Sequence, residues 1–201
     1  MALPAAYVVK RYSYKTGILV GLFLYAFGAL LFYPAAAMEN YTFFLLALYI
    51  LTFGLAFLET TANPFILSMG DEATATQRLN LAQAFNPMGA LMGLFVAQSF
   101  ILGALQSDDL DAQGNGIYES LSDSAKAVVK TADLEVIRNP YVALGIFVLL
   151  MMLVISFVKM PNTTQQESST SLWSSIKRIS RNERFVGGVI AQLFYVGAQI
   201  M

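Results

Sequence analysis

One acidic residue lies inside an otherwise uncharged stretch of the chain. Glu59 stands in the sequence LETTANPF and is the only charged residue between positions 40 and 70. Placing an ionised carboxylate in hydrocarbon costs about 2.5 to 3.5 kcal/mol, so such residues usually face a bundle interior or a water-filled cavity. There a glutamate can carry a proton, or it can stay neutral and hydrogen-bond a neighbouring helix. The position of Glu59 favours a proton carrier and leaves the packing role open.

An amide and a proline follow Glu59 within two helical turns. Asn63 lies at i+4, on the same helix face as Glu59. Pro64 has no N–H to donate to the carbonyl of Thr60, so it bends or loosens the helix and frees polar backbone groups. At membrane depth such groups are tolerated where they meet protein or a cavity. The acid, the amide and the kink therefore coincide, although an Asn-Pro pair alone predicts only an ordinary kink.

The next apolar stretch, RLNLAQAFNPMGALMG, carries amides instead of an acid. Asn80, Gln83 and Asn86 recur at every third position, so consecutive members are neighbours on one side of a helix. Each amide offers donors and an acceptor, which suits the hydroxyl groups of a neutral polyol. Gly89 and Gly93 then form GxxxG, a pattern that permits close helix packing but is common in membrane helices.

The last apolar stretch repeats the pattern with an aromatic residue. In GGVIAQLFYVGAQI, Gln192, Tyr195 and Gln199 fall at i, i+3 and i+7, on one helix face. Three stretches thus present polar, uncharged side chains together with the single acid Glu59. This set is expected of a sugar site with a proton-carrying group, although polar residues that only join helices would produce much of it.

Composition identifies the elements that would position these residues. The chain is 57% hydrophobic and 12% charged, with a mean hydropathy of +0.60, outside the soluble range of about 45–50% apolar and about 25% charged. A membrane span needs roughly 20 residues. The sequence predicts four spans, at about 16–38, 41–69, 79–105 and 139–159, and a truncated fifth at 183–201. The predicted fold class is therefore all-α, a polytopic membrane protein.

Charge bias orients these spans. If they alternate, nine basic residues fall on one side, which the positive-inside tendency makes cytoplasmic: Lys10, Arg11, Lys15, Arg78, Lys159, Lys177, Arg178, Arg181 and Arg184. The segment 106–138, with seven acidic and three basic residues, falls on the other side and is predicted to be a periplasmic loop.

Residues 161–182 form a polar connector rich in Ser and Thr. It is predicted to be a cytoplasmic linker between two helix bundles, with an interfacial amphipathic helix that places Trp173 at the headgroup level. A disordered connector is the alternative that composition leaves open.

Missing residue types and motifs exclude several functions. The chain has no Cys and no His, which rules out disulfides and thiol nucleophiles and removes the commonest metal ligand. Proton chemistry must use carboxylates, and no cofactor is expected. There is no H-E-x-x-H or G-x-S-x-G, and no basic patch beyond what orientation explains, so an enzyme and a partnership with nucleic acid are both disfavoured.

Four stretches carry a family resemblance: LETTANPF, RLNLAQAFNPMGA, AQLFYVGAQ and KRYSYKTGILVGLFLYAFGALLFYPAA. They are similar to the fucose and glucose/galactose proton-symporter family of the major facilitator superfamily, over essentially the whole chain. The resemblance implies part of a twelve-helix transporter of two six-helix bundles, from the end of helix 2 to the start of helix 7. Residues 1–160 would belong to the N-terminal bundle, and 183–201 would begin the C-terminal bundle. Of the superfamily signature before helix 3, the basic positions Arg11 and Lys15 match.

The resemblance also implies roles for individual residues. Glu59 would be the family's protonatable glutamate in helix 4, which favours fucose over glucose or galactose, whose carriers are expected to have a neutral residue there. The substrate-binding residues would come from three helices: Asn63, Gln83, Asn86, Gln192, Tyr195 and Gln199.

The function expected from this resemblance is import of L-fucose or a related sugar, coupled to protons by alternating access, in a bacterial inner membrane. The lipid bilayer and the remaining helices of the transporter would be its partners. The alternatives are a glucose/galactose-type symporter, or a non-transporting gene fragment with at most a structural or interaction role in the membrane.

Overall fold

The computed structural model describes residues 2–108, 116–160 and 177–200 of the chain. Every regular element in these ranges is a helix, so the predicted all-α fold class is confirmed. The chain divides into two compact units, Met1–Thr164 and Gln165–Met201, and each is described by itself.

Four helical segments of the first unit are long and apolar enough to cross a membrane, which matches the predicted number of full spans. A short helix, α1 (Ala2–Arg11), precedes them. The first segment comprises α2 (Tyr14–Leu30) and α3 (Phe32–Ala37), and the second is α4 (Tyr41–Ser68). The third contains η1 (Glu72–Thr74), α5 (Ala75–Gln83), α6 (Phe85–Val96), η2 (Ala97–Ile101) and η3 (Leu102–Ala104). The fourth is α8 (Asp123–Phe157), after the single turn α7 (Ile117–Ser120).

Polar residues cap the first turns of three of these helices. The Ser13 hydroxyl accepts from the backbone N–H of Thr16 at 3.1 Å and starts α2. The side chain of Asn40 accepts from the N–H of Thr42 at 3.0 Å and starts α4. The Ser122 hydroxyl does the same for α8. Each side chain satisfies a backbone donor that has no partner inside its helix, which is why the helices begin there.

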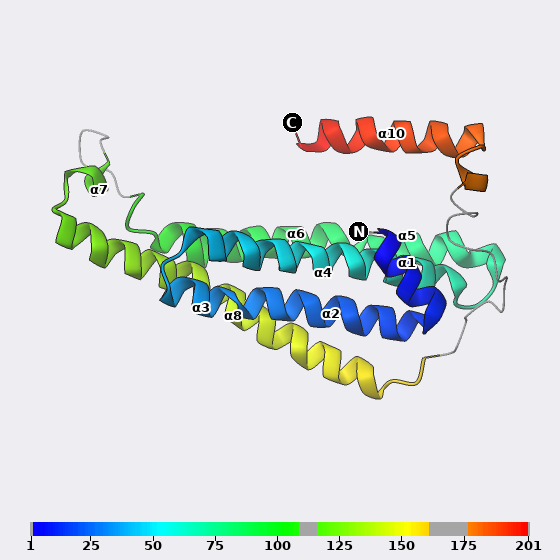
Figure 1. Cartoon of the computed structure of the whole chain (residues 1–201), viewed down its shortest axis with the longest axis horizontal. Helices are drawn as coiled ribbons and strands as arrows, with labels where there is room; N and C mark the ends of the chain where they lie inside the picture. Colours follow the sequence, from blue (N-terminus) through cyan, green and yellow to red (C-terminus); the bar gives the residue numbers. More distant parts are fainter. Residues whose placement is uncertain (1, 109–115, 161–176, 201) are drawn as a thin grey trace. The chain divides into compact units, whose positions relative to one another are not determined.

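Helices α2 and α4 pack closely along their length. α4 buries one stripe of residues spaced three or four apart: Ala47, Leu51, Gly54, Phe57, Thr61 and Phe65. Glycines allow the close approach, because a Cβ on Gly28 would overlap the backbone of Leu51 and a Cβ on Gly54 would overlap the backbone of Tyr25. The two helices run side by side in Figure 1. Small residues at such contacts are typical of membrane helix pairs.

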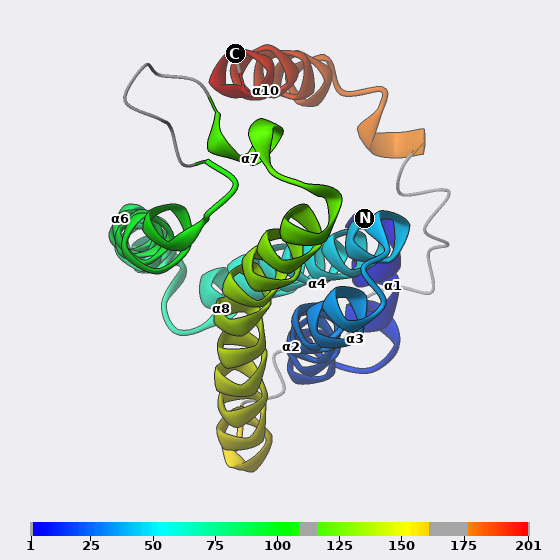
Figure 2. The same cartoon turned by 90° about the vertical axis from the view of Figure 1, so that its left-hand side faces the viewer.

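Helix α8 completes this core. One buried cluster joins α2, α4 and α8: Ile18, Leu22, Ala26, Phe65 and Val148. Nearer the other end of α2 and α3, the Phe32 ring stacks on the ring of Tyr141 with centroids 4.0 Å apart. In the end-on view of Figure 2, α2, α3 and α4 lie together while α6 stands apart from them. The core of the first unit is therefore a three-span bundle to which the third span is attached separately.

Helix α8 begins well before the predicted start of the fourth span at residue 139. The predicted loop 106–138 contains α7 and the first part of α8, from Asp123 to Arg138. At 1.5 Å rise per residue, the 35 residues of α8 extend about 52 Å, whereas the hydrocarbon layer is about 30 Å thick. Hydropathy marks only the part of a helix that lies in lipid, so it gives no signal for the charged first half of α8.

The second unit contains helix α10 (Glu183–Ile200), which occupies nearly all of the predicted truncated span 183–201. Asn182 starts it, because its side chain accepts from the N–H of Arg184 at 3.1 Å. Most of the predicted linker 161–182, including Trp173 and most of the proposed interfacial helix, lies outside the described residues, while residues 177–179 are helical.

Candidate functional site

Glu59 lies on the free side of α4. Phe57 and Thr61 are buried in the stripe that packs on α2, whereas Glu59 is exposed. A helix turns about 100° per residue, so a residue two positions from either of them points to the opposite side. Glu59 is therefore not part of the contact between α2 and α4, and its carboxylate is available to water, to an ion or to a ligand on the other face.

Asn63 and Pro64, the two residues that the sequence associates with Glu59, lie beside it on α4. Asn63 is half-buried and follows one turn later on the same side of α4. Pro64 lies inside α4, which continues through it, so the carbonyl of Thr60 receives no N–H from that position. The Thr60 hydroxyl donates to the carbonyl of Ala56 at 2.7 Å. A carboxylate, an amide and a carbonyl thus gather within one turn, which is suited to exchange of a proton and to binding of hydroxyl groups.

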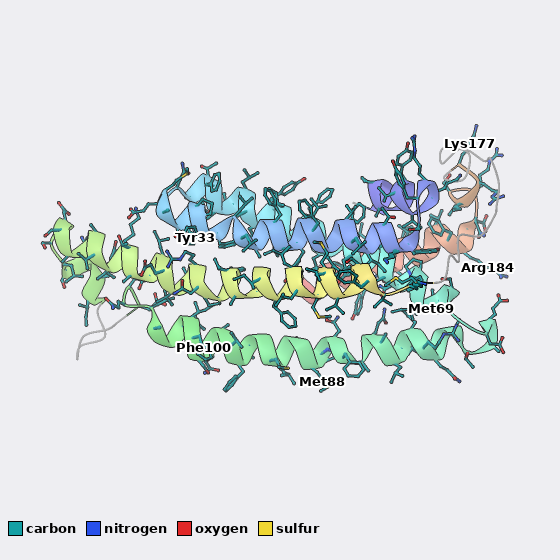
Figure 3. All side chains as sticks on the ribbon, turned by 90° about the horizontal axis from the view of Figure 1, so that it is seen from below. Tyr33, Met69, Met88, Phe100, Lys177 and Arg184 are labelled. Carbon is teal, nitrogen blue, oxygen red and sulfur yellow. The ribbon has the colours of Figure 1, made fainter. Side chains whose placement is uncertain are left out.

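Gln83 and Asn86 flank the junction of α5 and α6. Gln83 is the last residue of α5, Asn86 is the second residue of α6, and Ala84 lies at the junction between them. Both amides are exposed, as are all residues from 80 to 96. Figure 3 shows α6 as a separate rod with Met88 and Phe100 extending from this span, and both of those side chains are more than half exposed. The amides are therefore displayed on a helix that few side chains of the first unit cover.

The predicted packing motif GxxxG lies on this same exposed helix. A Cβ added to Gly89 or to Gly93 would meet nothing within 4 Å. Among the described residues the pattern therefore makes no close helix contact, and the glycines that do so belong to α2 and α4.

The remaining predicted residues belong to α10 of the second unit. Gln192 and Tyr195 are exposed and three positions apart, which places them on one side of the helix. Gln199 belongs to the same helix, and its side chain lies outside the described residues. The structure thus pairs Glu59 with Asn63 on one helix face, and Gln83 with Asn86 on another. It leaves the joining of these pairs with α10 in one site as a prediction.

Three polar contacts that tie helix ends together are not predictable from the sequence. Lys15 Nζ donates to the carbonyls of Ser156 at 2.7 Å and Val158 at 2.8 Å, at the end of α8. Lys130 Nζ lies 2.8 Å from Glu39 Oε2. The third contact joins Asp133 to the segment after η3. Most of the acceptors and donors in these contacts are distant in sequence or belong to the backbone, so residue spacing gives no signal for them.

No group of three or more His, Cys, Asp or Glu that could hold a metal ion is found among the residues that the structure describes. The candidate residues present a carboxylate, amides and a phenol, which can exchange hydrogen bonds with a neutral polyhydroxyl ligand.

Comparison with known proteins gives a consistent family assignment. The family model described as Major Facilitator Superfamily matches residues 1–201. The chain is 54% identical to the L-fucose-proton symporter of Haemophilus influenzae, over 100% of this chain and 47% of that protein. It is 39% identical to the L-fucose-proton symporter of Escherichia coli K12, over 98% and 45% respectively. The putative glucose/galactose transporter of Helicobacter pylori J99 is 33% identical, over 96% and 43%.

A solved structure supports the same assignment at the level of the fold. The crystal structure of the Escherichia coli fucose:proton symporter FucP superposes with a TM-score of 0.84 at 38% identity, over 98% of this chain and 48% of that chain. The chain therefore spans about half the length of the relatives that it matches. Its helices, its spans and its sequence agree with one non-enzymatic family of multi-pass membrane transporters, and the chain belongs to the Major Facilitator Superfamily.

Proposed function

We propose that the chain acts, together with the further helices that its relatives carry, in proton-coupled import of L-fucose across a bacterial inner membrane. Two L-fucose-proton symporters are 54% and 39% identical to it, whereas the glucose/galactose transporters are 33% and 32% identical. This difference supports fucose over the glucose/galactose alternative.

The observation that carries the proton-coupling role is the position of Glu59. It is the only charged residue between positions 40 and 70, and it lies opposite the stripe that packs on α2. A glutamate kept only to join α4 to α2 would have to lie in that stripe. An intramembrane acid on a free helix face is instead the arrangement expected of a group that binds and releases a proton.

The proposed cycle uses this acid as a switch. Protonated Glu59 is neutral and favours the outward-facing cavity, where it hydrogen-bonds the sugar or a neighbour. Release of the proton to the cytoplasm biases the return step of the transport cycle. A ligand shifts such an equilibrium only by its differential affinity for the two states. In this proposal the amides of Asn63, Gln83 and Asn86 bind sugar hydroxyls in both states, and Gln192, Tyr195 and Gln199 are further substrate-binding residues.

The test is transport by the chain completed with the helices of the Haemophilus relative, in proteoliposomes. Glu59→Gln is expected to retain counterflow of radiolabelled L-fucose and to lose accumulation driven by a proton gradient. Glu72→Gln is the matched control, because Glu72 is an exposed acid in the turn before α5. Uphill uptake that is unchanged in Glu59→Gln would refute the coupling role.

The same assay separates the alternatives. Stronger competition by galactose or glucose than by fucose would support the glucose/galactose-type carrier. Absence of counterflow in the completed parent protein would support a structural or interaction role, and Glu59 would then be a packing residue.

A further inference from the structure

The span that carries Gln83 and Asn86 is held to the rest of the first unit at its two ends. Its middle, residues 80 to 96, is exposed throughout. The packing of the span against other helices is concentrated where α5 meets α4 and where η2 meets α8. The position of the two amides therefore depends on how those ends are fixed.

Asp133 fixes the end that follows η3. Its Oδ1 accepts from the backbone N–H of Gln106 at 2.9 Å, and its Oδ2 accepts from the N–H of Ser107 at 3.0 Å. Only 7% of Asp133 is exposed, which makes it the one buried charged residue among those that the structure describes. Hydrogen bonds from N–H groups to a carboxylate are about twice as strong as neutral ones. Both carboxylate oxygens thus accept hydrogen bonds from two successive backbone N–H groups of the segment that follows the third span.

Arg78 fixes the opposite end. Its guanidinium donates to the carbonyl of Asp71 at 2.9 Å and to the hydroxyl of Thr74, and it reaches the carbonyl of Leu67 in the last turn of α4 at 3.4 Å. The turn between these helices passes through Gly70, whose φ of +75° is rarely adopted by other residues. Arg78 therefore ties the start of α5 to the end of α4 across a tight turn.

We infer that Asp133 and Arg78 are positioning residues for the sugar site, because they anchor the two ends of the span that carries Gln83 and Asn86. Asp133 contributes more to this anchoring than Arg78, since the end of the span near η3 has little other packing. This inference rests on the proposed function for its sugar-binding readout, but the anchoring itself is a property of the fold.

Removal of the Asp133 carboxylate leaves the backbone N–H groups of Gln106 and Ser107 without their acceptor and frees the end of the span. In Asp133→Ala the side-chain amides of Gln83 and Asn86 then sample several positions. The apparent L-fucose affinity is therefore expected to fall about tenfold, the loss that corresponds to one charge-assisted hydrogen bond. Asp133→Asn retains one acceptor oxygen and is expected to lose less. Glu135→Ala is the matched control, because Glu135 is an exposed acid two residues later whose ion-pair partner, Arg138, is on its own helix.

A distance measurement tests the anchoring without sugar. The chain has no Cys, so cysteines introduced at Met92 in α6 and Leu55 in α4, both exposed, can be spin-labelled specifically in the full chain in liposomes. Asp133→Ala is expected to broaden the distance distribution between the labels, and Glu135→Ala is expected to leave it unchanged.

A second variant keeps the test decisive if Asp133→Ala does not fold. Ser107→Pro removes one of the two donor N–H groups from the other side of the contact and is expected to broaden the same distribution. Unchanged distributions in both variants would overturn the anchoring, and a broadened distribution with unchanged sugar affinity would overturn the positioning role. Failure of the parent protein to bind sugar would count against the proposed function, while the label distances would still decide the anchoring.

Discussion

Gly54→Ala tests whether α2 and α4 approach as closely as the structure shows. The added Cβ would overlap the N of Tyr25 and would lie 2.8 Å from the carbonyl carbon of Leu24 and from the Cα of Tyr25. All three are backbone atoms, so no side-chain rotation relieves the overlap. Ordinary van der Waals contact begins at 3.4 Å, so these two carbon atoms alone require a separation of 0.6 Å, the difference between 3.4 and 2.8 Å, and the closer Tyr25 N requires more.

The net effect on stability follows from two opposing contributions. Overpacking of this kind costs about 1 to 3 kcal/mol, and contact with backbone places it in the upper part of that range. Alanine gains at most about 1 kcal/mol over glycine in helix preference. Gly54→Ala is therefore expected to destabilise the first unit by roughly 1 to 2 kcal/mol. Gly93→Ala is the matched control, because its Cβ would meet nothing within 4 Å, so it is expected to be neutral or stabilising.

The assay is unfolding in mixed dodecylmaltoside and dodecyl sulfate micelles, followed by labelling of a single cysteine. Ala35, which is 0% exposed in α3, is replaced by Cys as the reporter, and no other thiol competes because the chain contains none. Gly54→Ala should shift the unfolding midpoint to a lower mole fraction of dodecyl sulfate. Equal midpoints for Gly54→Ala and Gly93→Ala would refute the close packing of α2 on α4.

Two further contacts give predictions at the ends of α8. The hydrogen bond from Lys130 holds the pKa of the exposed Glu39 carboxyl below its ordinary value. Because the folded-state pKa is lowered, the contact stabilises the fold above the ordinary carboxyl pKa, and this contribution disappears as the pH falls through the lowered value. The difference in unfolding midpoint between the parent and Glu39→Gln should thus be greatest at neutral pH and disappear in acid. A difference that stays constant down to pH about 3 would contradict this. Lys15→Met removes the donor to the carbonyls of Ser156 and Val158 and should weaken the last turn of α8 by about 0.3 to 1 kcal/mol. Faster amide hydrogen exchange in that turn, rescued by Lys15→Arg, is the expected result, and unchanged exchange would exclude the cap.

The fold class and the number of spans could be predicted from the sequence, because an uncharged apolar stretch of about 20 residues is rarely anything but a membrane span. The sequence is less informative about helix contacts. Gly89 and Gly93 form a GxxxG pattern, yet the close contacts are made by glycines such as Gly28 and Gly54. A small residue permits close approach, but the face that meets a partner is decided by the arrangement of all the helices.

The candidate site was predictable in part, where residue spacing alone decides the arrangement. The placement of Glu59 and Asn63 on one helix face follows from their spacing, and the structure agrees. The role of Asp133 does not follow from any spacing, because its partners are backbone N–H groups 26 and 27 residues earlier in the chain. Contacts that use backbone groups of a distant segment produce no recognisable pattern of side chains in the sequence.

The length of α8 has a mechanical consequence. Its charge-free part, from Asn139 to Phe157, is about 28 Å long and fills the hydrocarbon layer, while its charged part adds an arm of about 24 Å outside it. Pro140 lies inside α8 at the base of this arm, and its missing N–H loosens the helix at that point. Lys130 and Asp133 lie on this arm and contact the segments that follow the first and third spans, so the arm can keep these contacts while the part of α8 in the lipid changes its tilt.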